Sequence, residues 1–129
     1  MIDAAMLPTV FTILAMMLAL DAVWLTSTAT EFRSMLARIQ GEPLQMRWIP
    51  AGLVYIIMTT GLYYFAVSTA EDWKEAAVRG AGLGFLVYGT YDLTNLATIK
   101  HYSPQFAASD MMWGTFLFAT VAAVAKYMF

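Results

Sequence analysis

The stretch that decides the fold is Val87-Tyr88-Gly89-Thr90-Tyr91-Asp92-Leu93-Thr94-Asn95-Leu96-Ala97-Thr98, which ends a long apolar run. On a helix, residues three and four apart lie nearly above one another. One face would therefore carry Gly84, Tyr88, Tyr91, Asp92 and Asn95, and the other Leu83, Leu86, Leu93 and Ala97. This contrast predicts a helix with one side in hydrocarbon and the other side facing polar partners.

The composition is that of a membrane protein. Of the 129 residues, 60% are hydrophobic and 12% are charged, and the mean hydropathy is +0.63. A soluble domain carries about 25% charged residues. The net charge of −2 offers no basic patch for nucleic acid. The chain has no cysteine and one histidine, so we expect no disulfide and no metal or other cofactor.

Four segments are apolar enough for membrane spans, which need about 20 residues. We place them at about 7–28, 48–68, 78–98 and 110–129; their most apolar parts are Leu7–Leu25, Trp48–Val67, Gly80–Ala97 and Met111–Phe129. A short amphipathic helix, Glu31–Ile39, would lie in the interface after the first span. The prediction is an all-α, integral membrane four-helix transmembrane bundle in a single domain, 1–129.

The connections and helix ends follow from this placement. Loops are expected at Ala29–Arg47, Ser68–Val78 and Ile99–Ser109, with Ser109-Asp110 capping the last helix. Three tryptophans near span ends suit the interfacial belt: Trp24, Trp48 and Trp113. Basic residues number four on the side of the first and third loops (Arg33, Arg38, Arg47, Lys100) and three on the other (Lys74, Arg79, Lys126). The count favours cytoplasmic first and third loops.

Acidic residues from three helices should gather in one half of the bilayer. A carboxylate facing lipid costs about 2.5–3.5 kcal/mol even on the lenient insertion scale, so Asp21 and Asp92 should point into the bundle. Acids this close could share a proton or a cation. The candidate site for an ion, a proton or a polar ligand comprises Asp21, Tyr88, Asp92, Asn95, Lys100 and Asp110. Gly80 and Gly84 form a small-xxx-small pair for helix packing.

Plainer interpretations stay open for several of these residues. Asp21 and Asp92 could be hydrogen-bonding glue between helices, and Asp110 could be a helix cap. His101 suits a solvated loop position. Tyr88 and Tyr91 suit packing.

The sequence resembles a family of predicted membrane proteins, domain of unknown function twenty-one seventy-seven, over nearly its whole length. The most specific matching pieces are Tyr88–Thr98 with Lys100, and Asp110 with Trp113-Gly114-Thr115. Further pieces are Asp21–Leu25, Pro50-Ala51 with Tyr55, Phe65–Val67, and Gly80-Ala81 with Gly84; Phe32 departs from the usual Tyr. The resemblance implies a four-helix integral membrane protein and implies no particular reaction.

Three functions fit these features. The first is a small proton- or cation-coupled transporter or channel using the buried acids. The second is a membrane-embedded enzyme modifying a lipid or isoprenoid, with Asp21 or Asp92 as general acid or base. The third is a structural or accessory subunit. Besides the lipid bilayer, the expected partner is a second copy of the chain or another membrane protein, because four helices enclose little space.

Overall fold

The computed structural model describes residues 4–129, and helices form nearly all of it. In chain order these are α1 (Met6–Gln40), α2 (Trp48–Leu62) continued by the π-helix η1 (Tyr63–Val67), α3 (Trp73–Thr98) and α4 (Pro104–Met128). The described residues contain no strand. The predicted all-α fold with four main helices is therefore confirmed.

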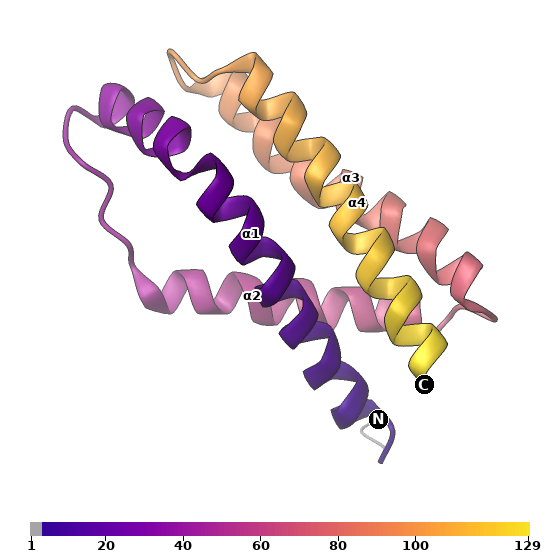
Figure 1. Ribbon diagram of the computed structural model, residues 1–129. Helices are drawn as coiled ribbons and strands as arrows, with labels where there is room; N and C mark the ends of the chain where they lie inside the picture. Colours follow the sequence, from indigo (N-terminus) through magenta and orange to yellow (C-terminus); the bar gives the residue numbers. More distant parts are fainter. Residues whose placement is uncertain (1–3) are drawn as a thin grey trace.

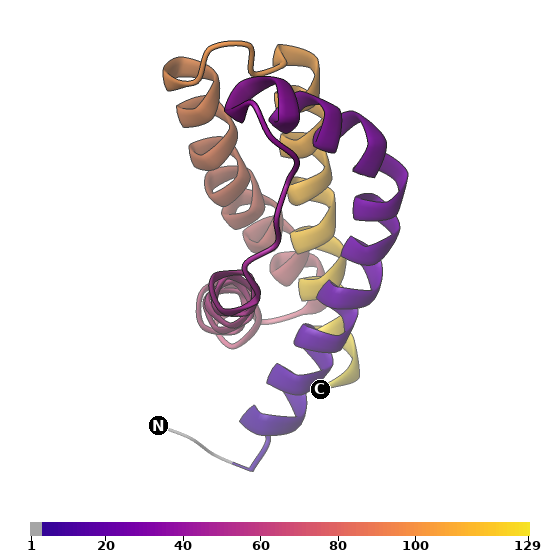
Figure 2. The ribbon, with the colours of Figure 1, turned by 90° about the vertical axis from the view of Figure 1, so that its left-hand side faces the viewer.

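The first helix is longer than its predicted span. α1 has 35 residues, about 50 Å at 1.5 Å per residue, against about 30 Å of bilayer hydrocarbon. Glu31–Ile39 is helical, but it continues α1 without a break instead of forming a separate interfacial helix. Its apolar side packs on the α3–α4 connection, where Met35 contacts Tyr102 and Phe106. Figure 2 shows these last turns of α1 curving over the end of α3 and α4.

The start of α3 is set by side-chain hydrogen bonds at its N-terminus. The Asp72 carboxylate accepts a hydrogen bond from the Glu75 N–H at 2.8 Å, and the Glu75 carboxylate accepts one from the Glu71 N–H at 2.7 Å. Asp72 satisfies a backbone donor that the first turn leaves free, and Glu75 holds the residue before the N-cap. The loop predicted at Ser68–Val78 is therefore too long, because α3 begins at Trp73.

The last helix also begins earlier than predicted. Ser103 is its N-cap, accepting a hydrogen bond from the Phe106 N–H at 3.1 Å, and Pro104 is its first residue. Proline favours that position because its missing N–H would have no partner there. The prediction that Ser109-Asp110 caps this helix is wrong, and Asp110 lies inside α4, 8% exposed.

The bundle is built on an antiparallel pair, α3 and α4, which run side by side in Figures 1 and 2. Gly80 and Gly84 lie at their contact. A Cβ atom added at Gly80 would sit 2.5 Å from the Phe118 carbonyl oxygen, and one at Gly84 would sit 2.3 Å from that of Gly114. The absence of side chains lets the two backbones approach closely. α1 packs against this pair, and α2 crosses it obliquely (Figures 1 and 2).

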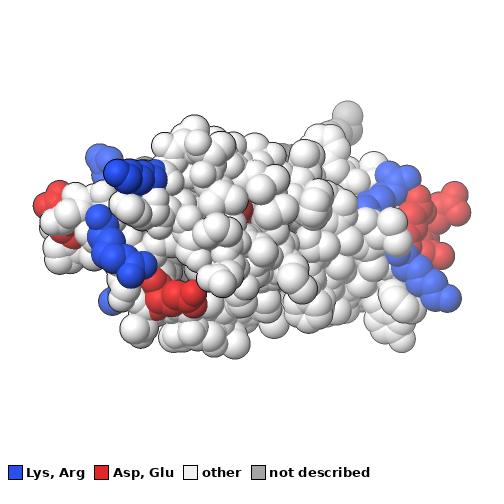
Figure 3. Space-filling view, turned by 90° about the horizontal axis from the view of Figure 1, so that it is seen from above, with Lys and Arg blue, Asp and Glu red and all other residues white. Residues whose placement is uncertain are grey.

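The outside of the molecule matches a bilayer. Charged side chains gather at its two ends in Figure 3, with an almost uncharged belt between them. Three helices are long and apolar enough to cross a membrane: α1, α2 with η1, and α4. α3 has 26 residues and is not among them, although the sequence predicted a span at about 78–98. The α1–α2 and α3–α4 connections lie at one end, and the α2–α3 connection and the C-terminus at the other (Figure 1).

Candidate binding site between the helices

Asp21, in the middle of α1, is held by donors from two other helices. Its Oδ1 atom accepts a hydrogen bond from the Trp113 indole N–H of α4 at 3.0 Å. Its Oδ2 atom accepts one from the Tyr55 hydroxyl of α2. The side chain is 5% exposed. A buried carboxylate needs such donors, because nothing else replaces the water it has lost.

Asp110 of α4 is held in a similar way, by a donor from α1. Its Oδ1 atom accepts a hydrogen bond from the Trp24 indole N–H of α1 at 3.1 Å. The rings of Trp24 and Trp113 stack between the two acids, with centroids 5.2 Å apart and planes 5° from parallel. Each helix thus supplies an Asp and, three residues later, a Trp. Because α1 and α4 are antiparallel (Figure 1), each Trp meets the Asp of the other helix. We call this arrangement the Asp–Trp clasp.

The acid in direct contact with Asp92 is Asp110. The two side chains lie close enough for their carboxyl groups to interact. Asp92 is 0% exposed, and its Oδ1 atom accepts a hydrogen bond from the Tyr102 hydroxyl at 3.1 Å. Its Oδ2 atom is buried without a hydrogen bond from any donor in the described residues. Two carboxylates only accept hydrogen bonds, so their contact becomes a bond when one of them carries a proton.

The other predicted site residues lie at different distances from the acids. Asn95 is half-buried and lies near Tyr91 and Tyr102, which places it beside Asp92 and Asp110. Tyr88 lies between the acids, half-buried. Lys100 is exposed after the end of α3, and the structure does not bring it into the buried group. In residues 4–129, no set of three or more His, Cys, Asp or Glu side chains could hold a metal ion.

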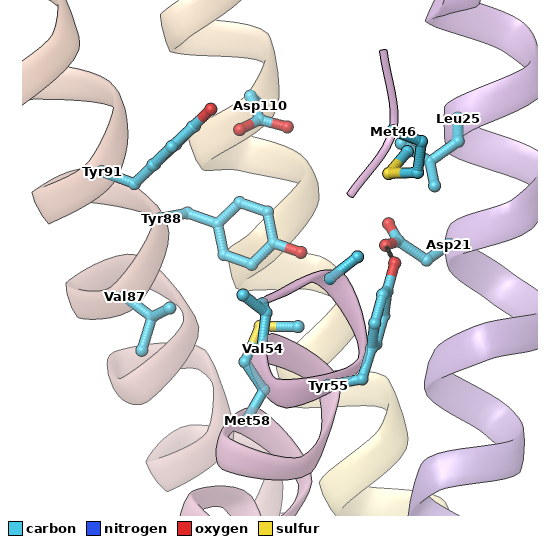
Figure 4. Close-up of a pocket in the computed structure, with 11 residues that line it drawn as sticks. Asp21, Leu25, Met46, Val54, Tyr55, Met58, Val87, Tyr88, Tyr91 and Asp110 are labelled. Carbon is cyan, nitrogen blue, oxygen red and sulfur yellow. Dashed lines mark hydrogen bonds between the residues drawn. The ribbon is translucent and has the colours of Figure 1, made fainter. Parts of the chain in front are cut away.

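A cavity of about 460 Å³ opens between the helices beside these acids. It is lined by eleven residues: Asp21, Leu25, Met46, Ala51, Val54, Tyr55, Met58, Val87, Tyr88, Tyr91 and Asp110. Figure 4 shows the Tyr88 ring at its centre, with the hydroxyl directed toward Asp21 and Tyr55. A second cavity of about 160 Å³ shares Asp21, Tyr88, Tyr91 and Asp110 and adds Trp24. The acids therefore stand at the polar end of a mainly apolar space.

A glycine of α4 makes room for the central tyrosine. A Cβ atom added at Gly114 would lie 2.1 Å from the Tyr88 ring. The ring also meets Phe118 edge to face, with centroids 6.0 Å apart. Any side chain at Gly114 would displace the Tyr88 ring, which lines the cavity. The backbone contact of α3 and α4 thus fixes the shape of the site.

Comparison with known sequences identifies the family of the chain. The sequence model of the family described as "Predicted membrane protein (DUF2177)" matches residues 6–127. The chain belongs to this family. Neither the curated proteins nor the solved structures gave a significant match.

For this DUF2177 protein, family membership and the three apolar helices identify an integral membrane protein. The sequence predictions missed the contacts of Trp24 and Trp113 with acids of the other helix, which form the clasp. The signal was present in the equal spacing of Asp21–Trp24 and Asp110–Trp113. Equal spacing on antiparallel helices allows such reciprocal contacts.

Proposed function

We propose that the protein is a small proton-coupled membrane transporter, in which Asp92 and Asp110 carry the coupling proton and the adjoining cavity holds the transported molecule. One observation supports this most: Asp110 belongs both to the buried carboxyl pair and to the cavity wall. A change of protonation at the pair therefore changes the charge that a molecule in the cavity contacts.

The pair is suited to hold one proton. Each carboxylate taken out of water loses several kcal/mol of solvation, and two adjacent carboxylates repel each other. A single proton between them removes one charge and gives Asp92 Oδ2 the partner it lacks. Ionisable groups within membrane helices commonly mark proton or ion pathways.

The proposal includes assembly and orientation. A bundle of four helices has little interior, so we propose a homo-oligomer, or a complex with another membrane protein, as the working form. The first and third loops would face the cytoplasm, because they carry the larger number of basic residues.

Proton flux into sealed proteoliposomes, followed with an internal pH dye, tests the proposal. With a concentrated small-molecule extract of cells added as the source of the transported molecule, the wild-type protein should dissipate an imposed pH gradient faster than empty vesicles do. Asp92→Asn and Asp110→Asn should return the rate to that of empty vesicles. Glu42→Gln removes an exposed acid in the first loop and should keep the wild-type rate. Equal fluxes in wild-type and empty vesicles, or undiminished flux in both Asp variants, would refute the proposal.

A second candidate function, an enzyme acting on a lipid or isoprenoid, is favoured by the apolar lining of the cavity. An acyl or isoprenoid chain would lie along Leu25, Val54 and Met58, with its head group at Asp21 or Asp110. Either acid could then act as general acid or base. Lipid profiles of cells with and without the protein should differ by one lipid class if this is correct, and identical profiles would count against it.

A further inference from the structure

We propose that the cavity beside Asp21 and Asp110 binds an organic monocation, an ammonium group carried on an apolar body. This inference rests on the proposed transport function and names its substrate class. It comes from the charge, the aromatic rings and the size of the site.

The charge of the site is negative or neutral, and no protein group makes it positive. Asp21 and Asp110 line the cavity, and the buried Asp92 is a neighbour of Asp110. None of the eleven lining residues, all within the described part of the chain, is basic. The lysine and arginine side chains lie toward the two ends of the molecule (Figure 3). An anionic ligand would meet repulsion here, and a cation would supply the missing countercharge.

Aromatic rings surround the acids. Tyr55, Tyr88 and Tyr91 line the larger cavity, and Trp24 lines the smaller one. Ring faces attract cations, and such contacts contribute about 0.5–2 kcal/mol or more when the cation is desolvated. A quaternary or protonated amine gains from rings and carboxylates together. An uncharged molecule of the same shape gains from neither.

The size and lining of the space suit an organic molecule better than a bare inorganic ion. A cavity of about 460 Å³ falls within the range of about 300–1,000 Å³ that holds drug-sized molecules. Its wall away from the acids is aliphatic: Leu25, Met46, Ala51, Val54, Met58 and Val87. This wall would cover the apolar body while the ammonium group lies at the acids.

Cation binding would expel the shared proton. With the cation present, Asp110 and Asp92 can both be ionised, and the proton leaves to solvent, so one positive charge replaces another. Cation affinity should therefore rise with pH. The titratable and hydrogen-bonding groups that face the pair and the adjoining cavity are Asp21 and Trp24 of α1, Tyr55 of α2, Tyr88, Tyr91 and Asn95 of α3, and Tyr102 of the α3–α4 connection.

Equilibrium binding of a matched ligand series to the wild-type protein tests this inference. The probes are benzyltrimethylammonium, its neutral carbon isostere neopentylbenzene, and the anion benzenesulfonate, measured in nanodiscs at several pH values. The quaternary ammonium has no proton to lose, so any pH dependence comes from the protein. We expect the cation to bind about tenfold or more tightly than the isostere, the anion not to bind, and proton release in weakly buffered solution.

Two variants give an additional test of cation binding. Asp110→Asn should weaken cation binding about tenfold or more and abolish proton release, and Glu42→Gln should change neither. Equal binding of the cation and the isostere would overturn the inference, even if Asp110→Asn failed to fold. Proton flux that depends on Asp92 and Asp110, without selective cation binding, would refute the substrate class and leave the transport proposal standing. Selective cation binding without any proton flux would refute the transport proposal and leave cation binding by the cavity standing.

Discussion

Trp24 and Trp113 stack within 5.2 Å and each donates its indole N–H to an acid on the other's helix. This contact joins α1 to the α3–α4 pair at the level of the cavity. It also supplies one donor to each of the two acids that line the cavity. The clasp therefore links the stability of the bundle to the protonation and hydrogen bonding of the site.

Replacing Trp113 with phenylalanine should destabilise the protein. Trp113→Phe keeps an aromatic ring in the stack but removes the donor to Asp21 Oδ1. Leaving a buried acceptor without its partner costs about 1–3 kcal/mol. Thermal unfolding in detergent should show a clear fall in midpoint. Trp48→Phe is the matched control, since Trp48 is 77% exposed, and an equal fall in both variants would contradict a specific role for the clasp.

The two acids and two tryptophans should also be energetically coupled as pairs. A double-mutant cycle on Trp24→Phe and Asp110→Ala should give a coupling energy of about 0.5–3 kcal/mol, the range for groups in contact. Trp24→Phe combined with the distant Glu42→Gln should be additive. Additivity in both cycles would mean that the hydrogen bond between Trp24 and Asp110 contributes nothing measurable.

Alanine at Gly84 should separate α3 from α4. Its Cβ would lie 2.3 Å from the Gly114 carbonyl oxygen and 2.8 Å from the Phe118 Cβ, and backbone atoms cannot turn aside. We expect a loss of about 2 kcal/mol or more, measured by unfolding in detergent. Gly82→Ala is the control on the same helix, because nothing lies within 4 Å of its added Cβ. The control should be neutral or slightly stabilising, since alanine favours helix over glycine.

Thr59→Val should not destabilise the protein. Thr59 is 2% exposed, and its hydroxyl oxygen has no hydrogen-bond partner among the described residues. Valine has nearly the same shape and carries no polar atom to bury. The midpoint of unfolding should stay the same or rise. A fall of more than about 1 kcal/mol would reveal a hidden partner for this hydroxyl.

The first turn of α3 should loosen in acid. The pKa of Glu75 lies below its ordinary value of 4.5, because its carboxylate accepts a hydrogen bond from the Glu71 N–H and a second from Arg79. A lowered pKa stabilises the folded state above the unfolded pKa, and this stabilisation is lost as pH falls. Amide hydrogen exchange at the start of α3, corrected for intrinsic rates, should be more protected at about pH 6 than at about pH 3. Glu75→Gln should remove the difference.

More of the fold than of the site could be predicted from the sequence. The cost of a carboxylate in lipid was enough to place Asp21 and Asp92 inside the bundle, where both are buried. The same reasoning could not pair them, because pairing depends on helix rotation and register. Asp92 meets Asp110, and Asp21 meets Tyr55 and Trp113. Asp110 was the hardest residue to place, since Ser109-Asp110 resembles a helix cap while Ser103-Pro104 caps α4.

The most direct test of the proton shared by Asp92 and Asp110 is the infrared carbonyl band of a protonated carboxyl group at about neutral pH. The wild-type protein should show this band. Asp92→Asn and Asp110→Asn should each lose it, and Asp21→Asn should keep it. A wild-type spectrum without the band, or a band that persists in both pair variants, would contradict the account.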